Sequence, residues 1–105
     1  MDEQKKENLT LKEILKKEFN IDMPISGGNG NSMDDAIKID KEHKDWSAVE
    51  YSCLKYINQL MNRSWKLKEQ SLMEKNGRQY DQMKLKIDGD DNSFYNYYFD
   101  ITDHI

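Results

Sequence analysis

At Trp65 the spacing of apolar residues changes from the period of a helix to that of a strand. Upstream, apolar residues recur every three or four positions, which is typical of an amphipathic helix. Downstream, apolar residues alternate with lysines in 65–68 and again in 83–87, which is typical of half-buried strands. Asn76-Gly77 lies between these segments and is a strong hairpin signal. Together with the alternating segment from Phe94 to Thr102, the pattern predicts a three-stranded antiparallel meander.

The register of the first hairpin can be predicted from its apolar residues. A regular two-residue turn at Asn76-Gly77 would place Leu67 opposite Lys86, on the wrong face. A slip of one residue, through a bulge or a longer loop, instead pairs Leu67 with Leu85 and Trp65 with Ile87. For the second hairpin the apolar face predicts the pairs Ile87 with Tyr95, Leu85 with Tyr97, and Met83 with Phe99.

The opposite face of this sheet is predicted to be polar and aromatic. Its lysines would stand opposite one another, which costs stability unless anions are near. The predicted members of this face are Lys66, Lys68, Lys84, Lys86, Phe94, Asn96, Tyr98 and Asp100.

Two helices are predicted before the meander. Thr10 and Glu13 have the spacing of a capping box, and Asn20 is a plausible end for the first helix. Ser47 and Glu50 repeat the capping-box spacing at the start of the second helix. Its apolar stripe consists of Val49, Cys53, Ile57, Leu60 and Met61.

The segment between the helices is predicted to be extended. Pro24 excludes a helix over 21–25, and 36–40 alternates as a short strand does. The expected fold is therefore α+β and two-layered, with elements in the order α-(β)-α-β-β-β and the second helix packed across the apolar sheet face. We expect one domain over 9–105, preceded by a flexible charged segment, 1–8.

Composition restricts the class of protein. Cys53 is the only cysteine of the 105 residues, so a disulfide within the chain is excluded and a reducing, cytoplasmic setting fits best. No segment resembles an export signal or a membrane span. The net charge of -4 is unevenly distributed: residues 1–61 carry -3, residues 62–87 carry +4 and residues 88–105 carry -5.

The glycine-rich stretch SGGNGNS, residues 26–32, lacks the residues of a phosphate-binding loop. Gly28 and Gly30 are followed by neither a third glycine nor a lysine, and Asp34 and Asp35 would repel a phosphate. We interpret the stretch as a mobile corner whose glycines provide backbone freedom. Gly28 and Gly30 remain candidate contacts to a partner, and stiffening them should weaken binding with little loss of stability.

No catalytic or metal-binding constellation is recognised, so we predict a protein that is not an enzyme and needs no cofactor. Asp88, Asp90 and Asn92 match only the first part of a calcium loop, because Ser93 and Phe99 stand where glycine and glutamate are needed. The group Asp100, Asp103 and His104 lies at a chain end expected to fray. Cys53 is expected to be a buried core residue.

The expected function is protein binding, as an inhibitor or adaptor that covers a functional surface of its partner in the manner of small immunity-type proteins. Candidate anchors are Trp46, Phe94 and Tyr98, and the acidic segment 88–103, including Asp100, would steer a basic partner. One alternative is binding of single-stranded RNA through Lys66, Lys68, Lys84, Lys86 and Tyr98. Another is an enzyme completed in a homodimer, where Asp100 and His104 of two chains meet.

Overall fold

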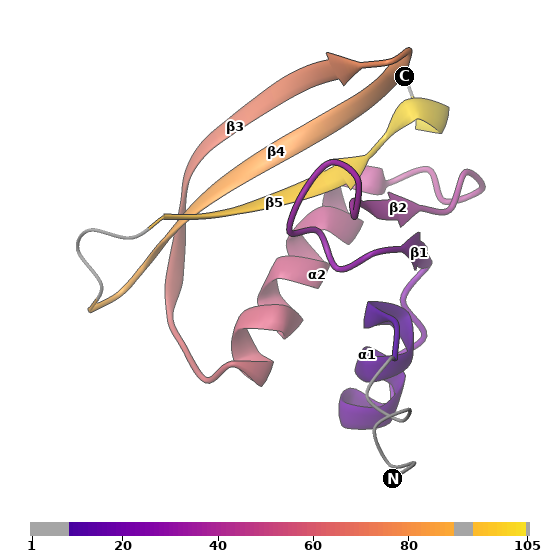
Figure 1. The fold of residues 1–105 in the computed structure, drawn as a ribbon. Helices are drawn as coiled ribbons and strands as arrows, with labels where there is room; N and C mark the ends of the chain where they lie inside the picture. Colours follow the sequence, from indigo (N-terminus) through magenta and orange to yellow (C-terminus); the bar gives the residue numbers. More distant parts are fainter. Residues whose placement is uncertain (1–8, 90–93, 105) are drawn as a thin grey trace, which may run out of the picture.

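The computed structural model of the chain describes residues 9–89 and 94–104 and shows two helices and five strands (Figure 1). The predicted flexible segment 1–8, and Asp90 and Asn92 of the calcium-like spacing, lie outside the described residues. In chain order the elements are α1 (Leu11–Phe19), β1 (Ile25–Gly27), β2 (Ile37–Ile39), α2 (Trp46–Leu60), β3 (Trp65–Lys75), β4 (Arg78–Ile87), β5 (Phe94–Asp100) and the 3-10 turn η2 (Thr102–His104).

The predicted α+β class and the β3-β4-β5 meander are confirmed, but the sheet is larger than expected. Its strand order is β1-β2-β5-β4-β3. The antiparallel β1–β2 hairpin joins the meander through a parallel pairing of β2 with β5, in which Ile37 lies opposite Phe99. Because β1 and β2 have only three residues each, their alternation is too short to reveal this pairing from sequence.

The first hairpin has the predicted register. Leu67 pairs with Leu85 and Trp65 with Ile87, with a register shift between Leu67 and Glu69. Asn76 and Gly77 form the turn with φ angles of 54° and 81°, as a two-residue hairpin turn requires. The tight turn and the bulge at Lys68 therefore act together to keep the apolar residues on one face.

The predicted register of the second hairpin is wrong by two residues. Leu85 pairs with Tyr95 and Met83 with Tyr97, while Phe99 lies opposite Asp81. Because side chains alternate with a period of two, this shift leaves every residue on its predicted face, so apolar patterning alone cannot distinguish the two registers.

The ends of α1 are as predicted, whereas the start of α2 is not. Thr10 Oγ1 accepts a hydrogen bond from the Glu13 amide at 3.2 Å, the Glu13 carboxylate accepts one from the Thr10 amide at 2.9 Å, and Asn20 ends the helix in the left-handed conformation. At α2 the cap is Asp45, whose Oδ1 accepts from the Ala48 amide at 3.3 Å. The predicted Ser47–Glu50 capping box is wrong because Glu50 is buried in the core.

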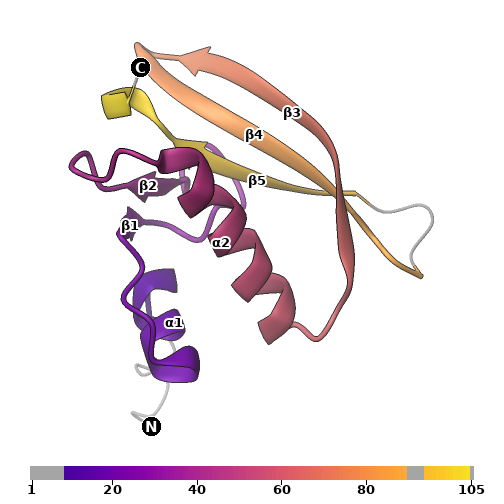
Figure 2. The same ribbon diagram turned by 180° about the vertical axis from the view of Figure 1, so that it is seen from behind.

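Both helices lie on the same side of the sheet (Figures 1 and 2). Leu11 and Leu15 of α1 belong to the same core cluster as Leu54 of α2 and Leu85 of β4. Phe19 and Tyr56 join the helices, with ring centroids 5.1 Å apart. The predicted packing of the second helix on the apolar sheet face is therefore confirmed, and α1 does not cover the lysine-bearing face.

The apolar stripe of α2 differs from the prediction at its C-terminal end. Val49, Cys53 and Ile57 are buried as expected, but Leu60 and Met61 are 42% and 57% exposed. The remaining buried positions of the helix are Glu50, Leu54 and Asn58. Glu50 and Asn58 are polar, so a search for apolar positions does not find them.

Candidate functional site

The sheet face turned away from the helices carries the best candidate site. We call it the outer face and define it by Lys66, Lys84, Lys86, Phe94 and Tyr98. Lys66 pairs with Lys86 across β3 and β4, and Lys86 pairs with Phe94 across β4 and β5, so the three side chains are adjacent on one face. Phe94 is 47% exposed.

Phe94 is flanked by two ammonium groups. Lys84 Nζ lies 4.9 Å and Lys86 Nζ 5.8 Å from the centroid of its ring. A ring face attracts cations at this range, typically by about 0.5–1 kcal/mol at exposed sites. The outer face therefore presents an aromatic surface with positive charge fixed around it.

Tyr98 and Lys84 have additional partners on the same face. The Tyr98 hydroxyl accepts a hydrogen bond from Gln82 Nε2 at 2.9 Å, and Lys84 Nζ lies 3.5 Å from Glu69 Oε1. The bulge removes Lys68 from the predicted place opposite Lys84, and Glu69 occupies it instead. Of the predicted facing lysines, only Lys66 and Lys86 stand directly opposite each other.

Trp46, the third predicted anchor, does not share this surface. It begins α2 on the helical side of the sheet and packs partly buried against the core cluster. Its ring centroid lies 6.4 Å from that of His104, whose Nε2 is 3.3 Å from the Ile39 carbonyl oxygen. Residues 102–104 of the end that was expected to fray form a 3-10 turn, and the His104 contact with Ile39 places this turn beside β2.

Asp100 is occupied by contacts within the fold. Its Oδ2 accepts from Arg78 Nε at 2.7 Å, and its Oδ1 accepts from the Thr102 amide at 3.1 Å and from the Thr102 hydroxyl at 2.6 Å. Partial burial acts to raise its pKa, but the hydrogen bonds from Arg78 and Thr102 outweigh it and hold the pKa of Asp100 below its ordinary value. Its charge is paired and contributes little to steering a partner.

The glycine-rich loop is an ordered part of the sheet edge, so its interpretation as a mobile corner is wrong. Gly28 and Gly30 donate to the carbonyls of Ala36 and Asp35 at 3.0 and 2.7 Å, and the Tyr98 amide donates to the Gly30 carbonyl at 2.8 Å. A Cβ on Gly28 would overlap Asp35, and Gly30 is buried with a φ of 89°. These glycines allow close approach of the backbone, so in place of the small loss of stability expected from the sequence we now predict a substantial one when either is substituted.

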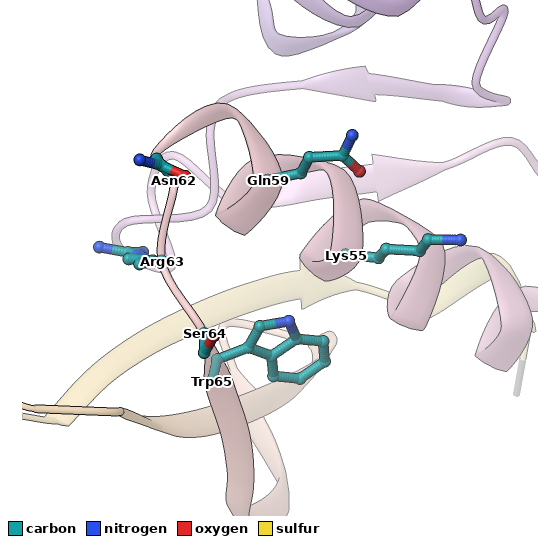
Figure 3. Close-up of a pocket in the computed structure, with 6 residues that line it drawn as sticks. All are labelled: Lys55, Gln59, Asn62, Arg63, Ser64 and Trp65. Carbon is teal, nitrogen blue, oxygen red and sulfur yellow. The ribbon is translucent and has the colours of Figure 1, made fainter.

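A hollow of about 480 Å³ lies where α2 ends and β3 begins (Figure 3). The ring of Trp65 forms part of its wall, and the side chains of Arg63 and Lys55 extend in opposite directions. The lining residues are Lys55, Gln59, Asn62, Arg63, Ser64 and Trp65.

The Arg63 side chain connects the end of α2 to β5 at this junction. Its Nε donates to Asn58 Oδ1 at 2.6 Å, one terminal nitrogen donates to the Tyr97 hydroxyl at 2.8 Å, and the guanidinium lies 4.6 Å from the Tyr95 ring centroid. Buried Asn58 in turn donates to the Leu54 carbonyl at 2.7 Å. Sequence reasoning missed Arg63, because a single arginine after a helix has no distinguishing local pattern.

The most unusual group in the core is a pair of carboxyls, Glu50 of α2 and Asp81 of β4, both inaccessible to solvent. Asp81 Oδ2 accepts from Gln70 Nε2 at 2.6 Å, but Asp81 Oδ1 and both Glu50 oxygens have no donor among the described residues other than a carboxyl proton. Burial above all, and then hydrogen bonding and charge from Asp81, raise the pKa of Glu50 to about 10. Glu50 therefore keeps its proton at neutral pH and can donate it toward Asp81.

This pair does not form a reactive centre with Cys53. Burial, with a smaller effect of Glu50, raises the pKa of the Cys53 thiol to about 12, so it stays protonated and matches the expected core role. A substrate could reach the carboxyls only if α2 and the sheet separated. Among the described residues, no group of three or more His, Cys, Asp or Glu side chains is placed to hold a metal ion.

In comparisons with known proteins, no family model, no curated protein and no solved structure matches the chain. Neither described helix is long and apolar enough to cross a membrane.

Proposed function

We propose that this chain is a protein-binding module that covers a functional surface of its partner, as an inhibitor or adaptor does, and that the outer face is its contact surface. The observation that carries the proposal is Phe94, a half-exposed aromatic ring on a sheet face that neither helix covers, with two lysine ammonium groups 4.9 and 5.8 Å from its centroid. Aromatic anchors surrounded by charged groups are typical of the energetic centres of protein interfaces.

The charges of the outer face favour an acidic contact surface on the partner. Lys84 and Lys86 lie beside Phe94, and Lys66 stands opposite Lys86 on the next strand, so an acidic surface would complement this group of positive charges. A basic partner recognised through segment 88–103 is less well supported, because Arg78 already pairs with Asp100. Association through the outer face should slow as salt is added.

Single-stranded RNA is the second candidate, and the same lysine pair favours it. A base could stack on Phe94 or Tyr98 while Lys66 and Lys86 contact phosphates. The chain's net charge of -4 opposes long-range attraction to a polyanion, which places this candidate below a protein partner. An enzyme completed by Asp100 and His104 is not favoured, because both side chains are engaged within the fold.

The test is affinity capture from the native lysate, a reducing cytoplasmic extract, with the unmodified chain and with Phe94→Ala. We expect at least one protein that is captured by the unmodified chain and not by Phe94→Ala. Met61→Ala is the matched control, because Met61 is at least as exposed as Phe94 but follows α2 on the other side of the sheet. Equal capture by all three chains, or saturable low-salt binding of a single-stranded RNA that Phe94→Ala abolishes, would count against a protein partner.

A further inference from the structure

The edge of the sheet formed by β3 carries a second surface, which adjoins the outer face at Glu69. β3 is the last strand in the sheet order and spans Trp65–Lys75, so one long side of it has no neighbouring strand among the described residues. Leu72, in its distal half, is 66% exposed, which exceeds the exposure of the other large apolar side chains described. Long edge strands with an exposed apolar residue readily pair with another strand.

The hairpin geometry identifies which backbone groups face this edge. Lys75 and Arg78 flank the two-residue turn, and such a flanking pair exchanges both of its backbone hydrogen bonds. Counting back in steps of two, the groups of Gln70, Leu72 and Glu74 point away from β4. All three residues are exposed, so their N–H and C=O groups are accessible to an added strand.

We propose that the distal half of β3 is a dimerisation edge at which a second copy of this chain pairs antiparallel, with Leu72 opposite Leu72. A two-fold axis perpendicular to the sheet is the symmetry that joins identical edges in antiparallel fashion and keeps their faces aligned. In this register Glu69 lies opposite Lys75 of the second copy, twice in the dimer, and Gln70 lies opposite Glu74. No two like charges face each other over 69–75.

The charges of β3 select this register over its neighbours. Moving the axis to Met73 places Leu72 opposite Glu74 and removes both Glu69–Lys75 pairs. Moving it to Ser71 places Leu72 opposite Gln70 and leaves Glu74 opposite Lys68, which lies in the bulge and not in the regular strand. The bulge after Leu67 ends the regular strand on the other side, which limits the pairing to the distal half. The alternating charges thus discourage indiscriminate edge pairing and fit one self-complementary arrangement.

The consequence is a continuous sheet of two copies with both outer faces on the same side. Each Phe94 would then belong to one extended surface, which allows a repetitive or dimeric partner to be bound at two points. The dimer itself rests on β3 alone and does not depend on the proposed function.

Sedimentation equilibrium of the full chain, from micromolar to millimolar concentration, tests the dimer. We expect the mass to rise with concentration from 12.5 kDa toward twice that value. Glu69→Lys and Lys75→Glu each place like charges opposite one another twice, and each should weaken the dimer by about tenfold. The double variant exchanges the two charges and should restore the dimer to within about threefold of the unmodified chain.

Two further variants complete the series. Leu72→Lys, at an exposed position where folding can be checked by circular dichroism, should give a monomer, while Met61→Lys should leave the dimer unchanged. A monomer at every concentration overturns the proposal. A dimer that the charge exchange fails to restore also overturns it, because another surface or register must then form the contact.

Discussion

Glu50 and Asp81 bring two carboxyl groups together in the core, one from α2 and one from β4, with neither accessible to solvent. Two ionised carboxylates in this place would repel each other and would both be desolvated. The fold is therefore more stable with a proton on the pair than without one, and the raised pKa of Glu50 keeps that proton in place at neutral pH.

Stability should consequently decrease as the pH rises. The pKa of Glu50 is about 10 in the folded chain against 4.5 as its ordinary value, so its contribution is fully present below about pH 4.5 and lost as the pH approaches 10. Urea unfolding between neutral and alkaline pH should show the free energy of unfolding falling by up to about 1.4 kcal/mol per pH unit.

Glu50→Gln should flatten this dependence, because an amide of the same shape needs no proton to remain neutral. At alkaline pH the variant should unfold at a higher urea concentration than the unmodified chain. Glu18→Gln, at an exposed position of α1, is the control and should leave the slope unchanged. If Glu50→Gln retains the full slope, another group is responsible for it.

Gly30→Ala and Gly89→Ala separate backbone strain from close packing. The two glycines have φ angles of 89° and 87°, but a Cβ on Gly30 would lie 3.0 Å from Ile37 Cδ1, whereas a Cβ on Gly89 would meet nothing within 4 Å. Gly89→Ala should cost about 1 kcal/mol for its left-handed conformation. Gly30→Ala should cost at least about 1 kcal/mol more, since its neighbours must shift. Equal losses of unfolding free energy in the two variants would show that the residues around Gly30 shift without cost.

Arg63→Lys should destabilise the junction between α2 and β3 by about 1–3 kcal/mol, because an ammonium cannot reach both Asn58 and Tyr97 while stacking on Tyr95. A double-mutant cycle with Tyr97→Phe should give a coupling energy of about 1 kcal/mol. Additive losses in thermal unfolding would mean that the contact between Arg63 and Tyr97 contributes nothing to stability.

Local signals accounted for much of the fold. The side chains of Thr10 and Glu13 close the cap of α1 themselves, and Asn76-Gly77 with the apolar pairs Leu67–Leu85 determines the first hairpin. The prediction was incomplete where distant segments decide the outcome. The joining of β2 to β5 depends on residues some sixty positions apart, and three-residue strands carry little periodic signal.

The candidate site was predicted only in part, because some of its residues are placed by contacts between distant segments. Alternation placed the outer-face lysines and Phe94 on one face, because a two-residue error of register does not change faces. Glu50 was misassigned to a cap, since its spacing from Ser47 fits a capping box as well as a buried position. Arg63 and the ordered glycine loop depend on contacts with β5, which sequence spacing does not reveal.

Binding of a protein through Phe94 of the outer face can be measured as the dissociation constant of a captured partner for the unmodified chain and for Phe94→Ala, with the urea midpoint of each chain measured alongside. We expect Phe94→Ala to bind at least about tenfold more weakly at an unchanged midpoint, which is the loss expected on truncating an aromatic anchor. An unchanged dissociation constant in a folded Phe94→Ala chain would contradict it.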